Sequence, residues 1–536
     1  MGPEANIHSI RLLEKQIEEG KGDIIKLKRT RNSLLNISTR VPPEILGYIF
    51  GWSLFRGSGG LLYSSNFEGL QEGSYRFLLV CHHWFEVASR TPELWSFWGN
   101  SLQDWKKCYH RSGASPLDLV LNEEKFTPDA FFDKSLQDAV RSHVRQDTIR
   151  QSHLMTGSTD VLTSIISSLT PSDEGGKNDN IESIIWTNEG FASVDISTFF
   201  ARSRLSKLRM LDLDGNLRIS SWDHLIPQTT LLTSLSLCFN KFPSSPLPTT
   251  SQLLSILASN PYLQELQLDG ALPDDDDGYT FKVPLRDMRM LTLSGVFRHL
   301  FGLLHRLTLP EALDDISLHG VNATSEDIPK ILGPYMRHYF QRDVRFQDRL
   351  EVFLEPSRYP TISIQTVRTK TTPSTYQPPW VSLSVDLADP PPDVLEQSVI
   401  NLIAPIPRER IVSFNAVLHT TLPEELFFTM PNIETLNLSG AGLFEGFLQP
   451  NPGGPRANTK IFPSLRSLRL ENVVFLNDGD WGHLAKYLAH QTSGGQTVSL
   501  KVIGRFPHTH PVADEIKGLV GEFTHYVDRE EEHKSG

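Results

Sequence analysis

The sequence predicts an α/β protein in which a short N-terminal helical region precedes a long series of strands and helices. Near the N-terminus, apolar residues recur at the three- and four-residue spacing of helices. From about residue 116 onward, short segments alternate leucine with polar residues, and stretches with helical spacing separate them. At 536 residues the chain is too long for one compact core, so we expect several domains or a repeat array.

Residues 1–36 form the first predicted element, a coiled-coil-like helix. Its apolar residues follow alternating three- and four-residue steps if Gly20 and Arg31 take two seam positions. The apolar seam residues are Ile10, Leu13, Ile17, Ile24, Leu27 and Leu34. Interior glycine weakens such a helix. The sequence leaves open whether it pairs with another chain or folds back on the next segment.

Two further helical segments occupy residues 41–50 and 78–88. The first opens with prolines, which suit the start of a helix, and the second precedes a Leu94-Trp95 pair. The first carries an apolar stripe at helical spacing, and the second carries several large apolar residues. These apolar residues are Ile45, Leu46, Ile49 and Phe50 in the first, and Leu79, Val80, Trp84 and Val87 in the second.

This ordered set resembles the F-box, a three-helix module that docks a protein onto the Skp-family adaptor of a cullin–RING ubiquitin ligase. The surrounding sequence is similar to the large F-box families of mushroom-forming fungi. The resemblance covers residues 38–98 and departs from the family in opening with Val41-Pro42 and in a Gly/Ser-rich inserted loop at about 57–74. It implies an adaptor-binding surface made of Pro42, Ile45, Leu46, Ile49, Phe50, Val80 and Trp84. Helical character continues through Trp98 and Trp105, so residues 99–115 are predicted to form a helical linker.

A repeated phrase organises residues 116–525. The segment from Leu205 to Asn216 has leucines at 205, 208, 211 and 213 before the asparagine, which fits the leucine-rich repeat pattern. Looser copies recur at roughly 25-residue intervals, with two longer steps. Their middle positions are Leu235, Leu266, Leu291, Ile316, Leu436 and Leu468. Because one strand-and-helix unit cannot bury its apolar edge alone, the repeats predict an irregular leucine-rich-repeat solenoid. Unrelated strands of an ordinary α/β domain are the alternative.

Other segments fit the same array less closely. Strands are expected at residues 117–121 and 181–187, and a helix at 252–258. The phrase degenerates between about 344 and 413, where residues 381–385 and 411–414 could supply strands. Loops are expected at 369–379 and 389–392, and residues 526–536 form a C-terminal tail.

Composition limits the functional classes. A net charge of −12 and a pI near 5.8 argue against a protein that coats nucleic-acid phosphates. Three widely separated cysteines give no disulfide framework, so we expect a reducing compartment, either cytoplasm or nucleus. No apolar run approaches the roughly 20 residues that span a bilayer, and we expect no membrane association.

No motif predicts catalysis, a cofactor or a metal. His508 and His510 lack further ligands at metal-binding spacing, and the run of aspartates at 274–277 lacks the alternation of a calcium loop. The glycine clusters do not continue into phosphate-binding motifs. We therefore expect a binding protein and no enzyme.

The resemblance implies the substrate-recognition subunit of a Skp–cullin–F-box ubiquitin ligase. The F-box would dock the adaptor, and through it a cullin–RING ligase, while the solenoid would bind an unknown target protein. The alternative is a non-catalytic leucine-rich-repeat interaction protein that acts outside a ubiquitin ligase. Strand alternation sends the leucines inward and the residues between them onto an open face. Candidate target-binding residues are Asp212, Asp214, Gln267, Asp269, Asn437 and Arg469.

Overall fold

The structure is a computed structural model of the whole chain. It describes residues 15–16, 18–26, 28, 41–56, 78–98, 110–113, 115–122, 149–171, 180–225, 229–239, 247–273, 281–310, 313, 315–323, 349–355, 361–367, 381–387, 398, 411–417, 430–440, 462–471, 478–504 and 511–526. The chain forms two compact units, Met1–Ser220 and Ser221–Gly536.

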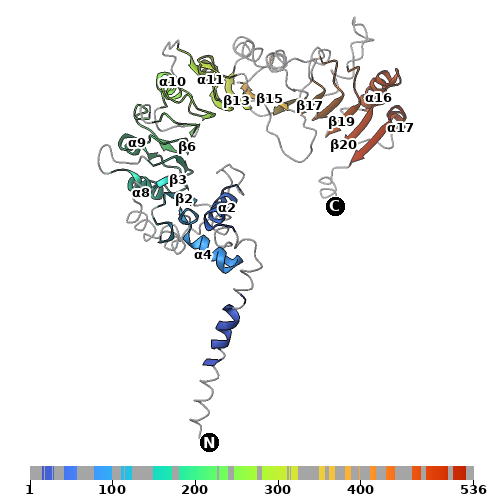
Figure 1. The fold of residues 1–536 in the computed structure, drawn as a ribbon. Helices are drawn as coiled ribbons and strands as arrows, with labels where there is room; N and C mark the ends of the chain where they lie inside the picture. The colour runs from blue at the N-terminus through green and yellow to red at the C-terminus, as the bar shows by residue number, and fades with distance from the viewer. Residues whose placement is uncertain are drawn as a thin grey trace. The chain divides into compact units, whose positions relative to one another are not determined.

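The described part of the N-terminal segment is helical between residues 15 and 28 (Figure 1). Charged pairs one turn apart, such as Lys15 with Glu19, lie along it. Gly20 and Ile24, the predicted seam positions among the described residues, are both exposed. The rest of the predicted seam lies outside the described residues, so the coiled-coil prediction stays a prediction.

Helices α2 (Pro43–Arg56) and α4 (His82–Arg90) and the short helix η2 (Pro92–Trp95) pack around a small apolar core. We call these three elements the helical module. The ring centroids of Phe50 and Trp84 are 4.8 Å apart, and the indole N–H of Trp95 donates to the carbonyl of Ala88 at 2.7 Å. Cys81 caps α4, since its sulfur accepts from the Trp84 backbone N–H. The predicted insertion at 57–74 lies outside the described residues.

The first unit continues directly into a parallel sheet. Its strand order is β1 (Phe97–Trp98), β2 (Leu117–Asn122), β3 (Ile149–Thr156), β4 (Ser183–Asn188) and β6 (Met210–Gly215). Two short strands, β5 (Val194–Asp195) and β7 (Leu217–Arg218), pair beside it, and helices α8 (Thr159–Leu169) and α9 (Ser197–Arg202) connect the strands. The expectation of helical structure through Trp98 was wrong, because Phe97 and Trp98 pair with Asp118 and Leu119 as a strand.

The second unit begins with a parallel series. It comprises β8 (Ser234–Phe239), β9 (Glu265–Asp269), β11 (Met290–Val296) and β13 (Asp315–Ala323). Helices α10 (Thr250–Ser259) and α11 (Phe297–His305) lie between them in sequence, and β10 (Val283–Pro284) pairs with β12 (Leu307–Thr308). The capping box of Thr249 and Gln252 fixes the start of α10 and confirms the helix predicted at 252–258.

The middle of the second unit departs from pure parallel pairing. β13 pairs in parallel with β16 (Val381–Leu387). β16 pairs in antiparallel fashion with β15 (Thr361–Val367). β15 in turn pairs in antiparallel fashion with β14 (Arg349–Glu355). β14 then pairs in parallel with β17 (Ser413–Val417), so β15 is the reversed strand of this series. The sequence predicted β16 and β17 but not β14 and β15. Their alternating residues fit a strand, and they lack the leucine phrase.

A regular parallel series closes the second unit. It runs from β17 through β18 (Thr435–Ser439), β19 (Ser467–Glu471) and β20 (Ser499–Ile503) to β21 (Glu522–Tyr526). Helices α16 (Asp478–Thr492) and α17 (Pro511–Leu519) lie together beside β20 and β21 (Figure 1). The mixed α/β class and the large parallel sheet are therefore confirmed.

Parallel register aligns the leucines of successive strands in both units. Leu211 pairs with Ile184 and Leu213 with Trp186, and all four are buried. The same alignment joins β9 to β11 and β18 to β19. Outward residues of each strand consequently form matching rows.

Turns after the strands are held by amides and glycine. The Asn216 amide donates to the Gly190 carbonyl of the preceding turn. Asn188 plays a similar part and donates to the Asn216 carbonyl at 2.7 Å. Gly215 has φ +84, and a side chain there would collide with the Asn188 carbonyl. Only glycine suits such a position.

Candidate functional site

The helical module exposes large apolar side chains. On α2 the side chains of Ile45, Tyr48 and Ile49 are 52%, 73% and 46% exposed. They lie at the three- and four-residue spacing that places residues on one face of a helix. Leu79, Val80 and Phe85 are exposed as well. We call these six residues the apolar patch. Large exposed apolar side chains are thus concentrated on this small module.

The predicted adaptor-binding residues divide into two groups. Pro42, Ile45, Ile49 and Val80 are exposed, and Trp84 is half-buried against the core. Leu46 and Phe50, only 3% and 1% exposed, are core residues. Both were predicted to lie on the contact surface, but the packing of α2 against α4 and η2 removes their side chains from solvent. Tyr48, Leu79 and Phe85 are exposed residues that the prediction left out.

The predicted target-binding residues lie on outward positions of the strands. Asp212 is half-buried and Asp214 is exposed on β6, while Gln267 and Asp269 are exposed on β9. Asn437 on β18 and Arg469 on β19 are half-buried and register partners. Asp212 and Asp214 belong to the first unit and the other four to the second, so the six do not form one established site.

The outward positions of β8, β9, β11 and β13 carry acidic but no lysine or arginine side chains. Their acids are Glu265, Asp269 and Asp315. Burial raises the pKa of Asp315 to about 6, although the backbone N–H of Ile316 opposes the shift. Its Oδ1 atom is buried and accepts no hydrogen bond from any described residue.

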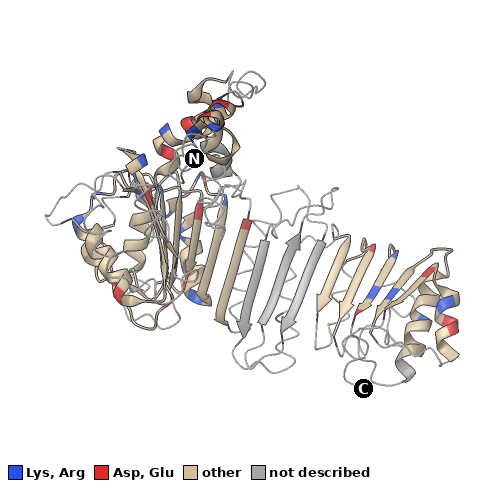
Figure 2. Ribbon diagram, turned by 90° about the horizontal axis from the view of Figure 1, so that it is seen from below, with Lys and Arg blue, Asp and Glu red and all other residues tan. Residues whose placement is uncertain are grey.

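The outward positions of β17 to β21 differ in chemistry. One row comprises Asn415, Asn437, Arg469, Lys501 and Thr524 in direct register. Figure 2 shows lysine and arginine positions as blue segments on neighbouring strands in the C-terminal part of the sheet. Arg469 contacts Glu471 at 2.6 Å, and the Lys501 ammonium lies 4.7 Å from the centre of the Tyr526 ring.

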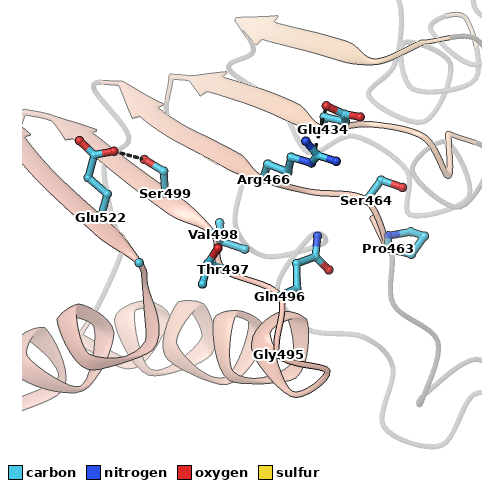
Figure 3. Close-up of a pocket in the computed structure, with 11 residues that line it drawn as sticks. Glu434, Pro463, Ser464, Arg466, Gly495, Gln496, Thr497, Val498, Ser499 and Glu522 are labelled. Atoms are coloured by element: carbon cyan, nitrogen blue, oxygen red, sulfur yellow. Dashed lines mark hydrogen bonds and ion pairs between the residues drawn. The ribbon is translucent and has the colours of Figure 1, made fainter.

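A cavity of about 880 Å³ lies where β18 to β21 begin. Figure 3 shows Glu434 beside Arg466, with a nitrogen–oxygen distance of 3.8 Å, and Glu522 accepting from Ser499. Gln496 reaches the Leu465 carbonyl at 2.6 Å. The lining is polar, and its Ser499 hydroxyl donates to the Glu522 carboxylate at 3.5 Å.

Buried titratable groups elsewhere in the first unit are structural. Arg150 makes two contacts with the buried Asp118 carboxylate, at 3.0 and 2.6 Å. Burial raises the pKa of Asp118, while Arg150 opposes the shift. Burial also lowers the pKa of His153 to about 4, so this ring is neutral near pH 7. Neither group lines a cavity that the structure describes.

The described residues contain no group of three or more His, Cys, Asp or Glu side chains placed to hold a metal ion. His508 and His510 lie outside them. Within the same ranges, no helix combines the length and apolar character needed to cross a bilayer. No family model matches the chain, and no curated protein matches it.

Proposed function

We propose that this chain is the substrate-recognition subunit of a Skp–cullin–F-box ubiquitin ligase. In this proposal the helical module is an F-box that docks a Skp-family adaptor, and the strands form an irregular leucine-rich-repeat solenoid that binds the target protein. Catalysis would belong to the RING subunit and its conjugating enzyme. This chain would contribute proximity, which makes transfer to the target effectively intramolecular.

The apolar patch is the observation that carries the proposal. Ile45, Tyr48 and Ile49 are exposed on α2 while Leu46 and Phe50 anchor the same helix from its other face. The module is therefore folded around its own core and still has apolar surface for a partner. In protein interfaces, a few large apolar residues that become buried on binding carry most of the binding free energy.

The solenoid part of the proposal rests on the strand register. Parallel strands align leucines inward and polar residues outward from one strand to the next. Stacked units of this kind bury a continuous core and leave a broad polar face, which suits protein recognition. The alternative is an interaction protein that acts outside a ubiquitin ligase. It would bind its partner through the same strand face but would not recruit a cullin.

The test of adaptor docking is the double variant Ile45→Glu with Ile49→Glu. Both side chains are exposed, so we expect the fold to persist and adaptor affinity to fall by at least about 2 kcal/mol. Leu231→Glu is the matched control, because Leu231 is an exposed aliphatic residue of the second unit. The measurement is titration of purified Skp adaptor, with circular dichroism as the folding check. Equal affinity of a folded double variant would refute adaptor docking through the apolar patch.

Capture from cells separates the two functions. Recovery of adaptor together with cullin supports the ligase, whereas adaptor without cullin supports a role outside it. The charge reversal Asp212→Lys with Asp214→Lys addresses the target. We expect it to leave adaptor recovery unchanged and to reduce recovery of co-purifying target proteins. Unchanged target recovery would exclude the outward face of β6.

A further inference from the structure

Two cations lie side by side on the outward face of the second unit. Arg469 of β19 is the direct register partner of Lys501 of β20. Neighbouring strands are about 4.8 Å apart, so these side chains start from adjacent positions. Like charges directly opposite each other destabilise a sheet. The pair therefore opposes folding, and a bound anion would relieve it.

The local contacts compensate these charges only in part. Arg469 shares its guanidinium with one carboxylate, that of Glu471, and although its Nε is buried, its side chain is 38% exposed and accessible to a second acceptor. Lys501 lies over the Tyr526 ring, which attracts a cation without neutralising it. Both side chains thus keep capacity for a further anionic acceptor.

The whole row has the same hydrogen-bonding character. It comprises Asn415, Asn437, Arg469, Lys501 and Thr524, and we call it the donor row. Each of the five side chains carries a hydrogen-bond donor, and none is a carboxylate. Across five strands the donor row spans roughly 19 Å, the length of about six residues of extended chain. Acidic residues lie at other outward positions of the same strands, with Glu471 on β19 and Glu522 on β21, so the donor row is the row without carboxylates.

We propose that the donor row binds an acidic segment of the partner protein, with aspartate or glutamate carboxylates placed at Arg469 and Lys501. This inference rests on the proposed function, because it names the chemistry of the target that the strands hold. Guanidinium and ammonium groups make their strongest hydrogen bonds with carboxylates. An extended segment crossing the strands would present alternate side chains to the donor row.

The experiment uses the full chain and a fluorescent eight-residue peptide of alternating glutamate and glycine. A lysine–glycine peptide is the counter-probe. We expect the glutamate peptide to bind more tightly than the lysine peptide and to weaken as salt rises. For the double variant Arg469→Gln with Lys501→Gln, we expect the affinity for the glutamate peptide to fall at least about tenfold, because two charge-assisted hydrogen bonds are lost. Lys486→Gln is the matched control on α16, where the side chain is exposed, and should change affinity less than about twofold.

Three results would overturn the inference: no binding of the glutamate peptide to the folded wild type, equal binding by the double variant, or equal affinity for the lysine peptide. Binding of a phosphoserine–glycine peptide without binding of the glutamate peptide would also overturn it. Adaptor titration on the same samples separates this inference from the proposed function. Peptide binding without adaptor binding would refute the ligase role alone, and adaptor binding without peptide binding would refute the donor row alone.

Discussion

The helical module and the parallel strands of the first unit bury apolar residues in different ways. On α2, apolar residues occur on both faces, so that Leu46 is buried while Tyr48 is exposed. On β6, strict alternation buries Leu211 and Leu213 and leaves Asp212 and Asp214 outward. The helical module thus has more apolar residues than its core buries, whereas strand β6 buries its leucines in the core.

This difference suggests two kinds of association. An apolar patch binds through burial of area, and such contacts are largely insensitive to salt. A polar strand face binds through charge and hydrogen bonds, which give specificity and respond to salt. Under the proposed function, the apolar patch would bind the adaptor and the strand face would bind the target.

The largest expected effect lies at the junction of the two regions. Asp118 pairs with Arg150, and its backbone N–H donates to the Ser96 carbonyl, which follows η2. Asp118→Ala should lower the free energy of unfolding by about 3–5 kcal/mol, because a half-buried guanidinium loses its counter-charge. Denaturant melts followed by tryptophan fluorescence and by circular dichroism measure it.

A matched double variant sharpens this prediction. Asp118→Ala with Arg150→Met should recover part of the lost stability, since no uncompensated charge remains. A single transition in both signals would mean that the module and the strands unfold together. Two separate transitions in the wild type would contradict a rigid junction.

Leucine burial in the strands should give the next effect. Leu213 is fully buried on β6, so Leu213→Ala should destabilise the protein by about 2–5 kcal/mol through lost burial and a cavity. The neighbouring Asp214→Ala, at an outward position, should change stability by less than about 0.5 kcal/mol. Similar melting temperatures for the two variants would contradict the inward and outward assignment.

His153 should make the strands sensitive to acid. Its folded-state pKa of about 4 lies below the ordinary value of 6.5, so the folded protein disfavours the charged ring. The contribution to stability is complete above pH 6.5 and is lost as pH falls toward 4, by up to about 3 kcal/mol. Urea melts between pH 7 and 4 measure this loss. The His153→Gln variant should show a shallower pH dependence, and an unchanged slope would assign the effect to other groups.

The smallest effect on stability is expected on the apolar patch. Ile45→Ala should change the free energy of unfolding by less than about 0.5 kcal/mol, because its side chain is largely exposed. The adjacent Leu46→Ala should cost about 2–5 kcal/mol, because Leu46 is a core residue. Thermal melts compare the two. A large loss for Ile45→Ala would show that this face supports the fold rather than a partner.

Sequence patterns predicted much of the strand array, and one available signal was missed. The leucine phrase located β6, β8, β9, β11, β13, β18 and β19. A glycine with positive φ also follows or ends several strands, at Gly215, Gly270, Gly440 and Gly504. This recurring glycine would have marked strand ends and added a copy at β20, which the leucine phrase did not locate.

The sequence by itself determined which residues alternate and which recur, because side-chain alternation follows from local backbone geometry. Tertiary structure decided that Leu46 and Phe50 face the core while Ile45 and Ile49 face solvent, since both pairs fit one helical stripe. It also paired Phe97 and Trp98 with β2 and reversed β15, because strand pairing depends on partners distant in sequence. The adjacency of Arg469 and Lys501 has the same origin: register, not sequence separation, places them side by side.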